Sequence, residues 1–376
     1  MEKGQKQYQK MTDLPASLTQ VTADWLEKHF REAGHEIPHI QSYSHKPMEG
    51  FTGAMGEVGI FTIEWDEDPG FGIPDTFVAK CPLDDDIARM YNEVMQFYIR
   101  EYGFYSDLSS EVDMRIPNCW INEYDQETGR AFLLLEYLSQ AEKGDILHGC
   151  SIDVMRTLVK DLAKMHGKFW MNERLLEIPW LIDWTAESLK LGIDITRQSW
   201  MNLAEREPER YPKDLFKVLE ETWVYNTDEW LDRYASLPWT LTHMDYELDN
   251  VLIDEQGPIV LDWQSVMRSH PGVDLAWLLA ASHTPDTLEV EGELLDLYRE
   301  TLLASGGPNW SSDDLEQALA WGILYPVSCQ AVPYLQDTSA YGEGAARMRR
   351  RFEKFLQGSI DAAIRWNLVG HLQPLI

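Results

Sequence analysis

The sequence predicts an α+β protein with a small strand-rich N-terminal lobe, residues 1–138, and a larger helical C-terminal lobe, residues 139–376. Three strand patterns fall in the first lobe, whereas long amphipathic helix patterns dominate after the polar stretch "SQAEKGD". A chain of 376 residues is long enough for two such cores. We expect a ligand-binding cleft between the lobes.

The elements of the first lobe follow from local patterns. "TADWLEKHFREAG" predicts a helix with Thr22 as N-cap and Gly34 at its end. A glycine-studded turn then leads into an alternating strand at residues 60–65, and the turn cluster "DEDPGFGIPD" separates this strand from the short apolar strand "TFVAKC". "DDDIARMYNEVMQFYIREYG" predicts a second helix, because its leading aspartates favour a helix N-terminus. "RAFLLLEYL", residues 130–138, is a further strand.

The second lobe begins with the long amphipathic helix "SIDVMRTLVKDLAKMHGKFWMN". The stretch "LTHMDYELDNVLIDEQGPIVLDW" then predicts a strand, a loop and two further strand segments around the turn "EQGP". Several helices complete the chain.

Composition restricts the class of protein. The 32 lysines and arginines against 63 aspartates and glutamates give a net charge of −31, which repels nucleic-acid phosphates. Such a charge attracts cationic small molecules if acidic groups line a cleft, although it also serves solubility alone. No stretch is apolar enough to span a membrane, and the polar N-terminus does not resemble a signal peptide. The four well-separated cysteines suit reduced thiols, so we expect a cytoplasmic protein.

The most informative motif is the pair Asp245 and Asn250, which have the D-x-x-x-x-N spacing of a kinase catalytic loop. Phosphoryl transfer needs a carboxylate that receives the proton of the attacking hydroxyl and oxygen ligands that hold Mg²⁺ at the nucleotide phosphates. Asp262, after the next strand, would supply a charged metal ligand. The alternative is a polar hairpin loop that only satisfies its own backbone.

A kinase also needs a lysine that reaches the phosphates and an acidic partner on the following helix. Lys80 is the basic residue of the strand "TFVAKC", and Glu93 lies within the next predicted helix. An edge-strand lysine and a surface pair of Arg89 with Glu93 are the alternatives. Because Lys80 and Glu93 occur in the order that a kinase requires, the sequence favours the kinase hypothesis.

The nucleotide contacts expected from backbone groups are less specific. Gly53 and Gly56 in "GFTGAMGEVG" allow amides to approach phosphates, although a hairpin without a ligand has the same composition. Glu136 and Leu138, at the end of "FLLLEYL", are candidates for the adenine hinge through their backbone groups.

In this order, these stretches resemble the aminoglycoside phosphotransferase superfamily, which has the protein-kinase-like fold. The likeness is carried by "FVAKCP", "NEVMQFY", "FLLLEYL" with "KGDILHG" after it, "LAKMHGKFW", "LPWTLTHMDYELDNVLI", "VLDWQ" and "PGVDLAWLL". It spans roughly residues 50–282 and looks most like the branch that includes ecdysteroid-kinase-like small-molecule kinases.

The resemblance implies a role for each matching residue. Asp245 would be the catalytic base, and Asn250 and Asp262 the Mg²⁺ ligands. Lys80, supported by Glu93, would bind the nucleotide phosphates.

Supporting residues follow from the same resemblance. His243 and Asp274 would fix the catalytic loop, and we expect His166 only to pack. The family usually has glycine where Met244 stands, so Met244 is a departure that could narrow the acceptor site.

The resemblance therefore implies an ATP- and Mg²⁺-dependent phosphotransferase acting on a hydroxyl of a small molecule, with cationic or aromatic alcohols among the candidate acceptors. Aromatic residues after the first helix of the second lobe, Trp180, Trp184, Trp200, Trp321 and Tyr325, could stack on such an acceptor or belong to the core. A catalytically silent nucleotide- or metabolite-binding protein of the same fold is the alternative. A metal-dependent hydrolase on His243, Asp245 and Asp249 has little support without further clustered histidines.

Overall fold

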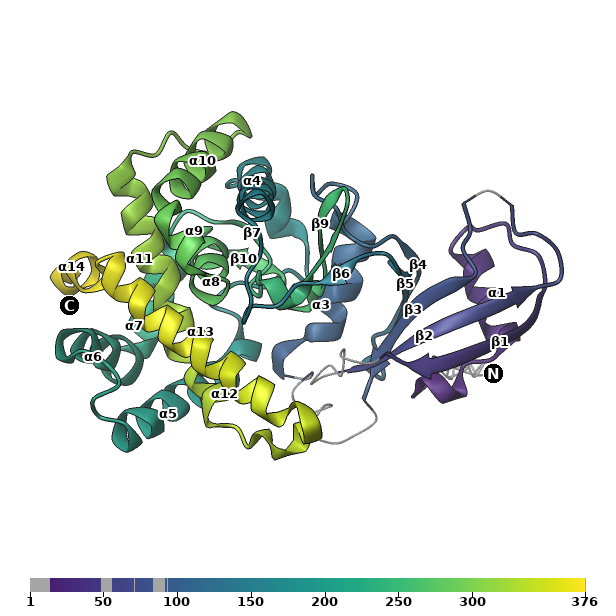
Figure 1. The fold of residues 1–376 in the computed structure, drawn as a ribbon, viewed down its shortest axis with the longest axis horizontal. Helices are drawn as coiled ribbons and strands as arrows, with labels where there is room; N and C mark the ends of the chain where they lie inside the picture. Colours follow the sequence, from purple (N-terminus) through teal and green to yellow (C-terminus); the bar gives the residue numbers. More distant parts are fainter. Residues whose placement is uncertain (1–13, 49–55, 71, 84–91, 93, 376) are drawn as a thin grey trace, which may run out of the picture. The chain divides into compact units, whose positions relative to one another are not determined.

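The computed structural model describes residues 14–48, 56–70, 72–83, 92 and 94–375 (Figure 1). The chain divides into two compact units, the first made of Met1–Ser106 and Asn118–Tyr137 and the second of Asp107–Pro117 and Leu138–Ile376. The first carries an antiparallel sheet and the second is mainly helical, which confirms the predicted α+β class.

The sheet of the first unit has the order β1-β2-β3-β5-β4, and all neighbouring strands are antiparallel. Its strands are β1 (Ile40–Pro47), β2 (Gly56–Trp65), β3 (Thr76–Pro82), β4 (Cys119–Asp125) and β5 (Arg130–Glu136). Because side chains alternate along a strand, Phe77, Ala79 and Cys81 of β3 enter the core, whereas Lys80 points to the opposite face.

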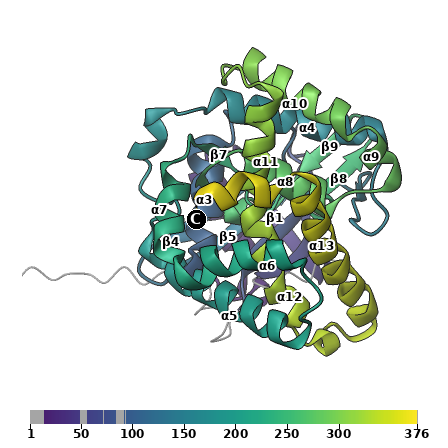
Figure 2. The ribbon, with the colours of Figure 1, turned by 90° about the vertical axis from the view of Figure 1, so that its left-hand side faces the viewer.

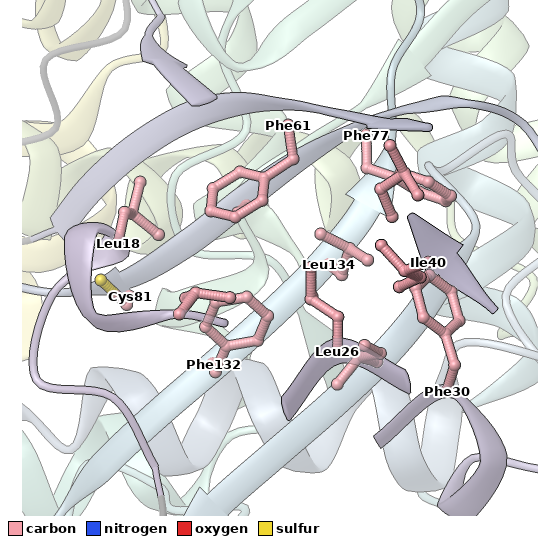
Figure 3. Close-up of a cluster of buried hydrophobic side chains, with 13 residues drawn as sticks. Leu18, Leu26, Phe30, Ile40, Phe61, Phe77, Cys81, Phe132 and Leu134 are labelled. Atoms are coloured by element: carbon pink, nitrogen blue, oxygen red, sulfur yellow. The ribbon is translucent and has the colours of Figure 1, made fainter. Parts of the chain in front are cut away.

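Helix α1 (Ala23–Glu32) covers the core face of this sheet (Figure 3). It begins as predicted, since the Thr22 side chain accepts a hydrogen bond from the amide of Trp25 at 3.2 Å. Leu26 and Phe30 of α1 pack with aromatic and aliphatic side chains of the strands. The members of this cluster from β2, β3 and β5 include Phe61, Phe77, Phe132 and Leu134.

The helix predicted after β3 is interrupted. The chain is helical at Val94 and Met95, but Gln96 adopts a left-handed conformation (φ 56°), and α3 (Phe97–Gly103) starts after it. The side chain of Asn92 accepts the amide of Tyr98 at 3.0 Å, which stabilises this break. The leading aspartates lie in residues 84–91, outside the described part of the chain.

The second unit consists mainly of helices, with two small antiparallel sheets (Figures 1 and 2). The α-helices are α4 (Ile152–Lys168), α5 (Lys190–Arg206), α6 (Lys213–Glu220), α7 (Thr227–Ser236), α8 (Gly272–Ala281), α9 (Pro285–Glu289), α10 (Glu291–Ala304), α11 (Ser312–Cys329), α12 (Ala331–Leu335), α13 (Ala345–Arg365) and α14 (Leu368–Leu372). One sheet pairs β7 (Thr240–Thr242) with β10 (Met267–Ser269), and the other has the order β6 (Glu142–Lys143), β8 (Val251–Asp254), β9 (Gly257–Val260).

Short 3-10 and π-helical segments connect these elements. They are η1 (Leu18–Gln20), η2 (Phe104–Leu108), η3 (Glu173–Glu177), η4 (Glu187–Leu189), η5 (Glu221–Tyr225), η6 (Leu248–Asn250), η7 (Trp263–Ser265), η8 (Thr338–Gly344) and η9 (Gln373–Leu375). Among the helices that the structure describes, none combines the length and the apolar character needed to cross a membrane.

Helices α8 and α11 touch through their backbones. A Cβ atom at Gly322 would lie 2.0 Å from the carbonyl oxygen of Gly272, and one at Gly272 would lie 2.0 Å from that of Ala318. Both distances are far below van der Waals contact, so only glycine fits at these two positions. The buried helix α8 is therefore held at a fixed distance from α11, and α13 packs against both helices (Figure 2).

Candidate active site

The loop between β7 and β8 carries the D-x-x-x-x-N pair. The side-chain amide of Asn250 donates to the carboxylate of Asp245 at 2.8 Å and to its backbone carbonyl at 2.9 Å. Segment η6 makes this contact possible, because its turn brings Asn250 back towards the start of the loop. The two residues of the motif therefore meet, as a kinase catalytic loop requires.

Asp262 joins this pair through the backbone of Leu261, the residue that follows β9. The amide of Leu261 donates to the carbonyl of Asn250 at 2.8 Å, which places the next residue, Asp262, beside the loop. Asp262 has a left-handed backbone (φ 61°), and its carboxylate accepts a hydrogen bond from the side chain of Gln264 at 3.3 Å. The structure thus brings together Asp245, Asn250 and Asp262.

The electrostatic surroundings of Asp245 are strongly acidic. Burial, followed by the carboxylates of Glu247 and Asp262, holds the pKa of Asp245 well above its usual range, and Arg351 and Asn250 oppose this shift only in part. A buried carboxylate beside two other acids is costly unless a cation or a proton neutralises it. The surroundings of Asp245 therefore favour a cation at this corner of the loop.

The start of the loop is fixed by Asp274 at the N-terminus of α8. Its two carboxylate oxygens accept the backbone amides of His243 and Met244, each at 2.7 Å. The side chain of Asp274 is fully buried, and it also contacts Nε2 of His166 at 3.2 Å. The other ring nitrogen of His166 bonds to the hydroxyl of Tyr298 at 2.7 Å. His166, which we expected only to pack, therefore belongs to a buried polar chain that ends at the loop.

Met244 has a left-handed backbone (φ 68°) that turns two successive amides towards Asp274. Glycine adopts this conformation without steric cost, which gives a physical reason for the glycine that the resembling family usually has at this position. The side chain of Met244 is 6 % exposed. It packs inside the unit, and this burial argues against Met244 as a wall of an open acceptor site.

His243 supports the loop from the side of β9. Its Nε2 lies 2.9 Å from the carbonyl oxygen of Leu261, and its Nδ1 lies 3.3 Å from the amide of Asp245. Burial lowers the pKa of His243, so the ring is neutral and satisfies one donor and one acceptor role. Both nitrogens have protein partners, which fits a structural histidine rather than a metal ligand.

The donor set next to Asp245 fits Mg²⁺. Asn250 uses its side-chain nitrogen towards Asp245, so its oxygen is the group it can offer to a cation. Asp262 adds a carboxylate to the same corner of the loop. Carboxylate and amide oxygens are the ligands that Mg²⁺ prefers, usually together with phosphate oxygens and water.

In the first unit, Lys80 forms an ion pair with Glu101 of α3, with distances of 2.7 and 2.9 Å to the two carboxylate oxygens. Glu101 is almost completely buried and was not identified from the sequence, whereas the predicted partner Glu93 lies outside the described residues. Gly56 lies against this lysine, because a Cβ atom there would be 3.7 Å from Lys80 Cε. Gly53 also lies outside the described residues.

The two predicted hinge residues have intramolecular backbone partners. The amide of Glu136, the last residue of β5, donates to the carbonyl of Asn118 at 2.8 Å. The carbonyl of Leu138 accepts the amide of Ala141 at 3.1 Å. A nucleotide would have to use the other backbone groups of this segment.

The aromatic residues considered as an acceptor platform are mostly core residues. Trp180, Trp184, Trp200 and Trp321 are buried, which favours the packing interpretation for all four. Only Tyr325 of α11 is partly exposed, and its ring lies 4.9 Å from that of Trp184. Together with side chains of η5 and α7 these two rings line a narrow apolar pocket. Its other aromatic residues are Trp223, Trp230 and Tyr234.

The sequence pattern does not predict the partners of the other two acids in this loop. Glu247 and Asp249 pair with Arg351 of α13, about a hundred residues further along the chain. The arginine-rich run "RMRRRFEKF" was visible as a signal, but its target could not be read from spacing.

Comparison with known proteins identifies the fold and the family. No curated protein matches the sequence. A crystal structure from Ralstonia eutropha JMP134, provisionally named an aminoglycoside phosphotransferase, superimposes with a TM-score of 0.52 at 14 % identity and covers 91 % of this chain and 97 % of its own. A choline kinase from Cryptosporidium parvum Iowa II gives a TM-score of 0.47 at 13 % identity, covering 89 % of this chain and 90 % of its own.

The first of these superpositions shows the protein-kinase-like fold that the resemblance predicts. The sequence model of the phosphotransferase enzyme family matches residues 91–314, which is more than half of the chain. This range includes the whole β7–β8 loop, Asp262 and Asp274. The chain is therefore a member of the phosphotransferase enzyme family.

Proposed function

We propose that this protein transfers the γ-phosphoryl group of ATP to a hydroxyl of a small molecule, with Asp245 as the catalytic base. The contact between Asn250 and Asp245, 2.8 Å from amide nitrogen to carboxylate oxygen, carries this proposal. It joins the base to a cation ligand on a loop that Asp274 holds rigidly. A loop that only satisfied its own backbone would not need a buried carboxylate to fix its two amides.

In the proposed reaction the acceptor oxygen attacks the γ-phosphorus in line, the bond to the β,γ-bridging oxygen breaks, and ADP leaves. The hydroxyl proton passes to the carboxylate of Asp245, which Asn250 holds in place by the 2.8 Å hydrogen bond. Asn250 and Asp262 would hold Mg²⁺, which supplies neutralisation of the phosphate charge when bound. Asp274 and His243 orient the loop and take no part in proton transfer.

We assign nucleotide binding to the lobe formed by residues 1–138 and acceptor binding to the lobe formed by residues 139–376. Lys80, kept in place by Glu101, would contact the phosphates. The glycines at 53 and 56 would allow backbone amides to approach the same phosphates, since Gly56 adjoins Lys80. The four cysteines are free thiols, which supports a reducing compartment such as the cytoplasm.

The acceptor class includes alcohols with a cationic or aromatic group. The net charge of −31 supports a cationic group, because the overall negative field raises the local concentration of cations. The pocket lined by Trp184 and Tyr325 has room for about one water molecule, so its aromatic faces are packed against each other and do not add to this argument.

A transfer assay tests the proposed function. Purified protein is incubated with Mg²⁺, a panel of amino alcohols, sugars and sterols, and either ATP or GTP, and mass spectrometry detects an added phosphate. Asp245→Ala should lower transfer by at least about 100-fold, because general-base catalysis contributes that much, while nucleotide affinity stays nearly unchanged.

Glu255→Gln is the matched control, since Glu255 is an exposed acid in the nearby turn between β8 and β9. An Asp245→Ala protein with the turnover of this control would remove the proposed base. Wild-type protein that binds nucleotide but phosphorylates nothing in the panel would support the silent alternative.

A further inference from the structure

Helix α13 contacts the candidate catalytic loop directly. The guanidinium of Arg351 reaches two acids of the loop at once, with Nε 2.8 Å from the carboxylate of Asp249 and a terminal nitrogen bonded to Glu247. A planar guanidinium can span two acceptors in a fixed geometry, which an ammonium group cannot do. The two acids lie on either side of Leu248, at the start of η6. By binding both acids, the guanidinium of Arg351 fixes η6, whose turn brings Asn250 to Asp245.

The contact between Arg351 and Glu247 is buried. Glu247 is 1 % exposed, and a carboxylate at that depth is costly unless a positive group neutralises it. Phe355, one turn after Arg351 on the same face of α13, packs edge-to-face against Trp277 of α8 with ring centres 5.0 Å apart. Figure 2 shows α13 beside α8, the helix that carries Asp274. Arg351 and Asp274 therefore hold the loop from two helices that pack on each other.

Neighbouring contacts of α13 strengthen the same attachment. Arg347 lies 3.1 Å from the carboxylate of Asp145 and 3.6 Å from that of Asp249. Asp249 also accepts a hydrogen bond from the amide of Ile146 at 3.0 Å. The ammonium group of Lys354 donates to the carbonyl oxygen of Ile146. The helix thus ties the catalytic loop to the segment before α4.

The charges around the base explain why an arginine is useful there. Three carboxylates, from Asp245, Glu247 and Asp249, lie within five residues of the chain, and Asp262 adds a fourth. A nucleotide phosphate would approach this group against its negative field. Arg351 offsets the two acids that have no catalytic task in the proposed reaction.

We propose that Arg351 is a positioning residue: through Glu247 and Asp249 it sets the geometry in which the loop presents Asp245 and Asn250 for phosphoryl transfer. This inference rests on the proposed function. Arg351 touches neither substrate nor reacting atoms in this mechanism, so its removal should slow the transfer step more than it weakens nucleotide binding.

The test compares Arg351→Met with Arg365→Met on the same helix. Arg365 forms an equally complete fork, with both distances to Glu291 at 2.8 Å, but its partner lies in α10 and not in the loop. Using ATP, Mg²⁺ and the best acceptor of the panel, we expect Arg351→Met to lower kcat by about 10- to 100-fold with little change in the KM for ATP. Arg365→Met should keep the wild-type kcat per folded molecule.

Arg351→Lys serves if the methionine variant does not fold. It keeps the charge but loses the fork, so kcat should lie between those of the wild type and Arg351→Met, at nearly wild-type melting temperature. Equal kcat values for the variants at 351 and 365, or a wild-type kcat in Arg351→Lys, would overturn the inference.

Hydrogen–deuterium exchange separates this inference from the proposed function. Peptides covering residues 243–251 should exchange faster in the Arg351 variants than in Arg365→Met, whether or not any alcohol is phosphorylated. If the wild type transfers phosphate to nothing, the proposed function fails while exchange still shows whether Arg351 holds the loop. Unchanged exchange in that peptide would refute the positioning role.

Discussion

Replacing Met244 by alanine and by glycine tests the left-handed backbone that precedes the proposed base. Both changes remove a side chain that is 6 % exposed, so both should destabilise the protein, by about 2–5 kcal/mol for alanine. The informative quantity is the difference between the two variants. At an ordinary position glycine is less stable than alanine by about 0.5–1 kcal/mol, because the unfolded glycine chain has more freedom to lose.

At Met244 the order should be reversed. A Cβ atom at φ 68° is strained, and alanine at positive φ costs more than the entropy it saves. We expect glycine to be more stable than alanine by about 1 kcal/mol, which corresponds to about 2–4 °C in melting temperature for a unit of this size. Urea and thermal unfolding followed by tryptophan fluorescence can resolve this difference.

Met165 provides the control pair. It is fully buried within α4, a regular helix, where alanine should be more stable than glycine by about 1 kcal/mol. The glycine variant could instead be less stable than the alanine variant by the same amount at both positions. The backbone at Met244 would then not be left-handed, and the explanation for glycine at this position in the family would fail.

Two further predictions concern the buried polar groups of the second unit. The Asp274→Asn variant has one acceptor oxygen for two amides, so its free energy of unfolding in urea should fall by about 3–5 kcal/mol. Tyr298→Phe, which removes only the hydrogen bond to His166, should lower it by about 1–3 kcal/mol. Equal losses in the two variants would contradict the central role of Asp274. Burial, and secondly His166, lowers the pKa of His270 to about 3, so the unfolded chain takes up a proton first as pH falls. The free energy of unfolding should therefore decrease as the pH falls from about 6.5 to about 3, and His270 should contribute up to about 1.4 kcal/mol per pH unit. In His270→Asn the free energy of unfolding should depend less steeply on pH. An unchanged pH dependence would show that His270 is not the cause.

Local patterns predicted much of the fold. The helix capped by Thr22, the strand that carries Lys80 and the strand–loop–strand around Asp245 all form where composition and periodicity place them. These elements depend on caps, alternation and turns within a few residues of each other. The break at Gln96 was not predictable in this way, since it depends on an asparagine side chain that captures an amide six residues later.

The proposed catalytic residues were recognisable from their spacing, but the residues that support them were not. A motif of six residues predicts that Asp245 meets Asn250. It contains nothing about Glu101, which reaches Lys80 from another helix, or about Arg351, which reaches the loop from α13. Such pairs depend on tertiary packing and have no local periodicity, so one sequence does not reveal them.

The glycine contact between α8 and α11 has a consequence for how distant substitutions would act. Where two helices meet backbone to backbone, no flexible side chain is present to absorb a change in volume, so an added methyl group displaces an entire helix. Gly272 lies two residues before Asp274, and such a displacement would move the carboxylate that anchors the loop. Residues 318–322, more than seventy positions after Asp245, thus help to fix the position of Asp274, and substitutions there should shift the candidate catalytic loop without contacting any ligand.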